Sequence, residues 1–159
     1  MSLEYTFSHS VDDVFDLFCD PDFLVDRSIA IGEVSADAEI EEDDNGKIYV
    51  KMRREVKRDL PSFLAKLFNP QQILTMEEEW QQIGEAMMGK SIFKVEGQPV
   101  TVKTEMTLKP TASGCVYSIK YNVKADIPLI KGKLEKFIKS NCEEGTQKEL
   151  EYAAKCLSA

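Results

Sequence analysis

The chain has 159 residues, of which 43% are apolar and 30% charged, and its formal net charge is −8. This length and composition are typical of one globular domain, which we expect to span residues 1–159. The acidic balance argues against nucleic acid as a partner and disfavours adsorption to an anionic membrane, because both attract basic surfaces. There is no apolar run long enough to cross a bilayer and no signal peptide at the N-terminus, so we predict a cytoplasmic protein without integral membrane association.

The first third of the chain predicts one strand and two short helices. Residues 2–8 alternate between apolar and polar side chains, as a strand does. Ser10, three residues before Asp13, resembles a capping box and predicts that a helix follows it. Asp20 and Pro21 predict the N-cap and first residue of a second helix, which Gly32 ends.

The rest of the chain predicts an antiparallel sheet and one long helix. Pro128 ends the strand pattern, and a helix is expected from about residue 129 to the C-terminus. The order predicts an α+β helix-grip fold, in which a strongly curved sheet of six to seven strands wraps around the C-terminal helix. After the two short helices we expect five or six strands, at the alternating segments 36–42, 47–57, 73–82, 86–96, 100–109 and 115–125.

The segment 74–80 indicates a cavity inside this fold. With a period of two, Leu74, Met76, Glu78 and Trp80 lie on one strand face, so a carboxylate lies between a Met and the only Trp. A core-facing Glu is costly unless it is paired or lies beside water. We therefore predict a cavity that is partly lined by polar groups.

Arg54 faces inward on the segment 47–57 and is the predicted partner of Glu78. An antiparallel pairing around the connection 57–72 would place Arg54 opposite Glu78 and Met52 opposite Trp80. Arginine and carboxylate groups form bidentate pairs, so the pair could orient a ligand. A purely structural ion pair is the alternative, and so is a bulge that turns one member to solvent.

The C-terminal helix supports the cavity. At ~100° per residue, Asn141 and Gly145 lie within about 40° of Leu134, in the middle of an otherwise apolar stripe. A packed core would place large aliphatic side chains there. The alternative is that Gly145 permits close helix–sheet contact and that Asn141 bonds to a neighbour.

Residues 60–68 interrupt two strands and place several apolar side chains on one helical face, namely Leu60, Phe63, Leu64, Leu67 and Phe68. We consider two roles, a lid over the cavity mouth and a short helix packed on the sheet edge. A membrane-dipping tip is a third role, which the net charge disfavours.

Enzymatic signals are weak. His9 is the only His and cannot build a His-based metal site, and the scattered Cys19, Cys115, Cys142 and Cys156 are expected to be reduced thiols. There is no nucleophile motif or phosphate-binding loop. We therefore predict no catalytic residue, metal or cofactor, although Glu78 could act as a general acid or base if burial raised its pKa.

Four segments carry a resemblance to a known superfamily, namely Asp59–Leu67, Glu79-Trp80, Gly97–Val100 and Ile127–Glu135. With these segments the chain resembles the START-like (SRPBCC) superfamily, which includes birch-pollen-allergen-like and polyketide cyclase-like proteins, and within it a bacterial family of uncharacterised function. The resemblance covers essentially the whole chain, and Lys131 stands where that family usually has Gly. It implies a helix-grip fold with a deep apolar cavity for lipids, sterols, polyketides or other hydrophobic ligands.

We therefore expect binding of a hydrophobic small molecule or lipid, for transport or sensing. A cyclase or hydrolase that uses Glu78 or a cavity Tyr is one alternative, and a protein-interaction module with an incidental cavity is another. The sequence does not indicate an oligomeric state. The residues predicted to line the ligand site are Met52, Arg54, Met76, Glu78, Trp80, Phe93, Met106, Tyr117, Tyr121 and Asn141.

Overall fold

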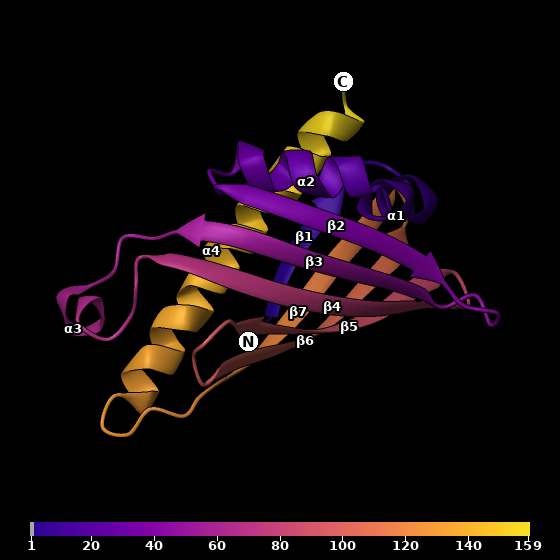
Figure 1. Ribbon diagram of the computed structural model, residues 1–159. Helices are drawn as coiled ribbons and strands as arrows, with labels where there is room; N and C mark the ends of the chain where they lie inside the picture. The colour runs from indigo at the N-terminus through magenta and orange to yellow at the C-terminus, as the bar shows by residue number, and fades with distance from the viewer. Residues whose placement is uncertain (1) are drawn as a thin grey trace.

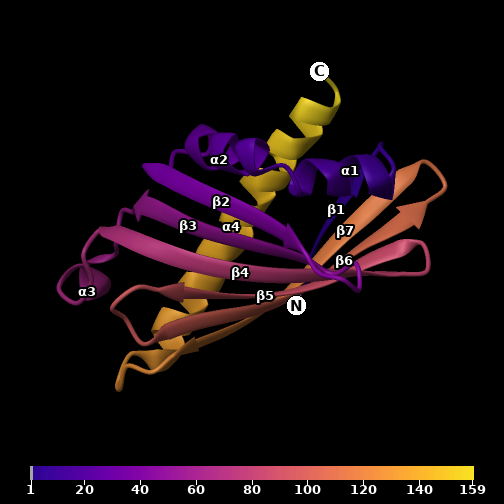
Figure 2. The same cartoon turned by 45° about the vertical axis from the view of Figure 1, so that its right-hand side comes forward.

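The computed structural model describes residues 2–159 and confirms the α+β helix-grip architecture. Seven antiparallel strands form one curved sheet in the order β1-β7-β6-β5-β4-β3-β2, and the long helix α4 lies along its inner face (Figures 1 and 2). The elements are β1 (Ser2–Phe7), α1 (Val11–Phe18), α2 (Pro21–Ala30), β2 (Ser35–Glu42), β3 (Ile48–Lys57), α3 (Ser62–Ala65), β4 (Gln71–Ile83), β5 (Ala86–Val95), β6 (Val100–Thr111), β7 (Gly114–Ala125) and α4 (Lys131–Leu157).

The two short helices begin where the capping residues predict. The Ser10 hydroxyl accepts a hydrogen bond from the Asp13 backbone N–H at 3.1 Å, and Asp20 Oδ1 accepts one from the Asp22 N–H at 3.0 Å. Each bond satisfies a donor that a helix N-terminus leaves without an intrahelical partner. These caps set where α1 and α2 begin, and α2 contributes Arg27 to the site described below.

The inward strand faces follow the predicted alternation and pack into two core clusters. On β6, the side chains of every second residue from Val100 to Leu108 are buried. The larger cluster surrounds Trp80 and Phe7, and the smaller one joins Leu64 and Phe68 to Leu134. Core packing therefore lies at both ends of the space between α4 and the sheet.

The segment 60–68 is less helical than predicted. Only Ser62–Ala65 forms a helix, and an Asn-Pro pair follows it, which disfavours helical backbone before the proline. Leu64 and Phe68 are buried, with 1% and 7% of their surface exposed, whereas Leu67 is 52% exposed. The segment therefore anchors itself through two side chains rather than through one continuous apolar face.

The predicted register of β3 and β4 is wrong by four residues. Arg54 lies opposite Leu74, not Glu78, and Met52 lies opposite Met76, not Trp80. The residue that faces Glu78 is Val50. A shift by an even number of residues leaves every side chain on its predicted face, so alternation alone could not detect the error.

None of the helices that the structure describes is long and apolar enough to cross a membrane. All four cysteines are free thiols, and Cys115 is fully buried. Burial raises the pKa of the Cys142 thiol, which lies on α4 beside the cavity, to about 12, so it stays protonated near neutral pH.

Candidate functional site

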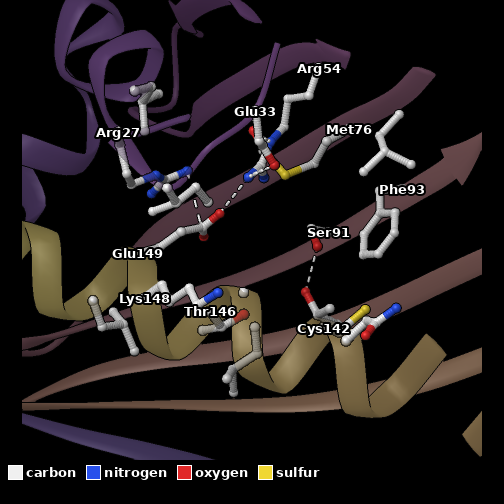
Figure 3. Close-up of a pocket in the computed structure, with 18 of the residues that line it drawn as sticks. Arg27, Glu33, Arg54, Met76, Ser91, Phe93, Cys142, Thr146, Lys148 and Glu149 are labelled. Atoms are coloured by element: carbon white, nitrogen blue, oxygen red, sulfur yellow. Dashed lines mark hydrogen bonds and ion pairs between the residues drawn. The ribbon is translucent and has the colours of Figure 1, made fainter. Parts of the chain in front are cut away.

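A cavity of about 300 Å³ lies between the sheet and α4, with walls from α2, the inward faces of β3 to β7 and the middle of α4 (Figure 3). The predicted cavity interpretation of Gly145 holds, because a Cβ added there would meet no atom within 4 Å. Nine of the ten predicted ligand-site residues line this cavity: Arg54, Met76, Glu78, Trp80, Phe93, Met106, Tyr117, Tyr121 and Asn141. That they bind a ligand stays a prediction.

Met52 does not line the cavity. Its side chain is buried, and its sulfur lies 4.0 Å from Nη2 of Arg27 on α2. The alternation of side chains along β3 correctly placed Met52 on the inner face of the sheet, but α2 covers that part of the face. Alternation along a strand cannot show which helix covers which part of the sheet.

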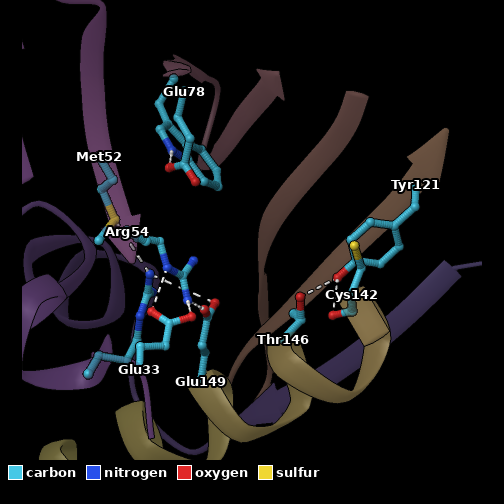
Figure 4. Close-up of polar contacts among 10 residues, drawn as sticks. Glu33, Met52, Arg54, Glu78, Tyr121, Cys142, Thr146 and Glu149 are labelled. Atoms are coloured by element: carbon cyan, nitrogen blue, oxygen red, sulfur yellow. Dashed lines mark hydrogen bonds and ion pairs between the residues drawn. The ribbon is translucent and has the colours of Figure 1, made fainter. Parts of the chain in front are cut away.

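Arg54 lies at the centre of a buried ionic cluster that replaces the predicted pair with Glu78 (Figure 4). Its Nε and Nη2 donate to the two carboxylate oxygens of Glu33, both at 2.7 Å. Nη2 also donates to Glu149 on α4 at 2.6 Å. The exposed fraction is 12% for the side chain of Arg54, 10% for Glu33 and 16% for Glu149. This bidentate, charge-assisted cluster is therefore largely shielded from water.

Within this cluster, opposite charges favour the ionised forms of Arg54 and Glu149. Burial disfavours the charged form of Arg54, but Glu149 and Glu33 outweigh burial and raise the pKa of its guanidinium. Burial likewise disfavours ionised Glu149, yet Arg27 and Arg54 lower the pKa of its carboxyl. Arg27 lies 3.8 Å from Glu149, so two arginines balance two glutamates at this end of the cavity.

Glu78 is bonded to Trp80 rather than to an arginine. The indole Nε1–H donates to Glu78 Oε1 at 2.9 Å, and Trp80 is the only hydrogen-bond partner of this carboxyl among residues 2–159. Gly89, opposite Trp80 on β5, makes room for the ring, because an added Cβ would lie 2.7 Å from the indole. Glu78 therefore presents a cavity carboxyl without an ion-pair partner in the described chain.

Burial raises the pKa of Glu78, while the Trp80 hydrogen bond and then Arg27 oppose the rise. Burial, with a smaller effect of Glu78, also raises the pKa of the neighbouring Tyr117 well above its ordinary value. Burial therefore shifts both groups toward their neutral forms. Both side chains line the cavity from the sheet, Glu78 on β4 and Tyr117 on β7.

Because Glu78 has no ion-pair partner among residues 2–159, Glu78→Gln should not destabilise the protein near neutral pH. A carboxyl whose pKa is raised by folding stabilises the fold fully below its unfolded pKa of about 4.3 and loses that contribution as pH rises through the folded pKa. The variant should therefore match the natural protein near pH 4 and melt at a higher temperature near pH 7. Thermal melts at both pH values test this, and a lower melting temperature of the variant at pH 7 would contradict it.

Two further pairs of polar side chains lie along the cavity walls. The Tyr121 hydroxyl on β7 is hydrogen-bonded to the Thr146 hydroxyl on α4. On the sheet, the buried hydroxyls of Ser91 and Thr104 pair with each other. These hydroxyls are satisfied within the protein, whereas the Nε–H of Arg27 has no hydrogen-bond partner in the described chain, and only one carboxyl oxygen of Glu78 accepts the Trp80 hydrogen bond.

Sequence reasoning missed Arg27, Glu33 and Glu149. Glu149 lies about 60° from Leu134 on the helical wheel, just outside the stripe that contains Asn141 and Gly145. Arg27 follows Phe23 by four residues and so shares its buried helix face, which was a usable signal. Glu33 follows the turn at Gly32, where no periodicity applies.

Within the described chain, His, Cys, Asp and Glu side chains form no cluster of three or more that could hold a metal ion.

Several solved structures share this architecture. A protein from Thermus thermophilus matches with a TM-score of 0.67 at 14% identity, covering 99% of this chain and 95% of that one. A protein from Chromobacterium violaceum matches with a TM-score of 0.58 at 18% identity, covering 100% and 97%. An uncharacterized protein from Rhizobium leguminosarum matches with a TM-score of 0.58 at 13% identity, covering 99% and 93%. At these identities the likeness shows the fold alone.

No curated protein matches the chain. The model of the family described as "Protein of unknown function (DUF2505)" matches residues 2–157, which is nearly the full length of the sequence. The chain therefore belongs to the DUF2505 family.

Proposed function

We propose that the protein binds a small, mostly apolar molecule in the cavity between the sheet and α4. The observation that carries this proposal is the open space of about 300 Å³ beside Gly145. This volume is at the lower end of the range for small-molecule sites. The cavity walls combine apolar side chains such as Met76 and Phe93 with a few placed polar groups, as ligand sites do. The helix-grip arrangement supports the further proposal that the chain is a START-like protein.

Arg27 indicates the kind of head group that fits. Its Nε–H is buried without a hydrogen-bond partner in the described chain, and its Nη2 donates only to the sulfur of Met52, a weak acceptor. A ligand oxygen would satisfy this guanidinium. Since Arg27 and Arg54 already balance Glu33 and Glu149, an added charge would be uncompensated. An uncharged carbonyl or hydroxyl head is therefore proposed.

A second, smaller chamber offers space for the apolar part of the ligand. This chamber of about 60 Å³ lies between the α3 segment and the first half of α4, lined by Leu64, Phe68 and Leu134 among others. Phe93 and Asn141 line both this chamber and the main cavity. A ligand with its oxygen at Arg27 would therefore extend its apolar end past Phe93 toward the chamber.

Gly145→Leu should abolish binding without harming the fold. The new side chain would fill the open space, and replacing a mid-helix Gly favours the helix by up to about 1 kcal/mol. Gly132→Leu is the matched control, because Gly132 is exposed at the start of the same helix and does not line the cavity. Titration with octanol, decanol and dodecanol, followed by the fluorescence of the single cavity Trp80, measures occupancy.

We expect a saturable fluorescence change for the natural protein and for Gly132→Leu, and none for Gly145→Leu. An unchanged response of Gly145→Leu, or no saturable response to any of the three alkanols, would overturn the proposal. The alkanols stand in for an unidentified natural ligand. If they bind, native mass spectrometry of the purified protein would identify a ligand retained from the cell.

Glu78 supports a second candidate function, proton transfer to a bound substrate. Its carboxyl has a raised pKa, lies in the cavity and has no cationic partner among the described residues, which are properties of general acids and bases. The two candidates differ in their need for this group. If the protein only binds its ligand, Glu78→Gln keeps the alkanol response. If the natural protein turns over a substrate and Glu78→Gln does not, catalysis is favoured.

A further inference from the structure

Three segments that are distant in sequence form one end of the molecule (Figures 1 and 2). They are residues 57–70 with α3, the β5–β6 turn at 96–99, and residues 126–140. The Lys133 Nζ lies 4.8 Å from the centre of the Phe63 ring, and the Asp126 N–H donates to the Pro99 carbonyl at 3.0 Å. We call these three segments the basic end.

The basic end is charged oppositely to the chain as a whole, which has 20 basic and 28 acidic residues. Glu135 accepts a hydrogen bond from the Ala125 N–H at 3.0 Å, and Asp126 lies 3.7 Å from Lys131, so the charges of that pair cancel. The end therefore presents a positive surface. It carries seven basic residues, Lys57, Arg58, Lys66, Lys131, Lys133, Lys136 and Lys139, against four acids, Asp59, Glu96, Asp126 and Glu135.

Two apolar side chains project from the same end. Leu129 is 104% exposed, and its φ of 74° makes it the one non-glycine residue with positive φ in the described chain. Leu67, on the α3 segment, is 52% exposed. A left-handed conformation is strained for Leu. A fully exposed side chain gains no packing energy that would offset this strain. Strain of this kind persists at functional positions, which indicates that Leu129 serves a contact outside the molecule.

We propose that the basic end docks on an anionic membrane surface, with its lysines among the head groups and Leu67 and Leu129 inserted between the lipids. Anionic leaflets attract basic clusters, and inserted apolar side chains add to that attraction. A protein partner would need a pocket for each protruding Leu, and a nucleic acid offers no apolar phase. The chamber lined by Leu64, Phe68 and Leu134 lies directly behind this end, so docking would bring it close to the lipid.

The net charge of −8 does not oppose this docking. At physiological ionic strength the field of an exposed charge is screened within about 8 Å, so the membrane responds to the face that approaches it rather than to the whole chain. The inference goes beyond the proposed cavity function. Its test requires no cavity ligand, so the two can fail separately.

Co-sedimentation with lipid vesicles tests the proposal. The protein should partition onto phosphatidylcholine vesicles that contain phosphatidylserine, not onto pure phosphatidylcholine, and added salt should release it. Each lysine near such a surface contributes about fivefold to partitioning, so Lys66→Gln with Lys133→Gln should weaken it roughly 25-fold. The control pair Lys109→Gln with Lys120→Gln removes the same charge from the solvent face of the sheet and should leave partitioning unchanged.

Leu129→Gly separates docking from stability. Glycine adopts positive φ without strain, so the melting temperature should stay the same or rise while partitioning onto the anionic vesicles falls severalfold. The proposal is overturned if the natural protein ignores phosphatidylserine vesicles at low salt, as it would if an acidic protein were the partner. It is equally overturned if the control pair weakens partitioning as much as the pair at the basic end.

Discussion

Arg54→Met is expected to destabilise the protein by roughly 3–5 kcal/mol at pH 7, because it removes the guanidinium that Glu33 and Glu149 share in a buried site. Part of the loss falls on Glu33, whose carboxylate bonds only to Arg54 among the described residues. Arg27 still lies 3.8 Å from Glu149 and limits the loss there. Urea denaturation of both proteins measures the difference.

Arg53→Met is the matched control, because Arg53 is the neighbouring residue on the exposed face of the same strand. Its stability should stay within about 0.5 kcal/mol of the natural protein. The deficit of Arg54→Met should also shrink in acid. Folding lowers the pKa of Glu149, so its contribution is present above the unfolded pKa of about 4.3 and is lost as pH falls through the folded value. An undiminished deficit at low pH would show that lost packing, not charge, explains the effect.

Leu64→Ala should cost roughly 2–5 kcal/mol, as deletions of buried leucine side chains do. Leu64 is only 1% exposed and packs with Leu134 in the smaller core cluster. Leu67, three residues along the same segment, is 52% exposed. Leu67→Ala should therefore change stability by at most about 0.5 kcal/mol. Urea denaturation of the pair measures both values.

This comparison also decides between the two roles considered for residues 60–68. A large loss for Leu64→Ala means that the segment is a fixed part of the core. A nearly neutral change would mean that the segment separates easily from α4 and opens as a lid. The packing of Leu64 and Phe68 against the start of α4 favours the fixed role.

Local chemistry was readable from the sequence. Ser10 and Asp20 marked the starts of α1 and α2, because a side-chain oxygen at the N-cap satisfies free backbone donors wherever the helix lies in the fold. Strand alternation placed Arg54, Glu78 and Trp80 on the inner face, because successive side chains point to opposite sides of a strand. Gly145 in the buried stripe of α4 correctly indicated open space.

Partners across the fold were not readable. Alternation fixes a face but permits any even shift of register, and the insertion of α3 between β3 and β4 removes the tight turn that would otherwise set the register. Arg54 and Glu149 are 95 residues apart, and only the docking of α4 against the sheet brings them together. The basic end likewise gathers three separate segments, so its charge is hidden in the total for the chain. Sequence patterns therefore determined which side chains lie on which face of each helix or strand. Tertiary packing decided which groups those side chains contact.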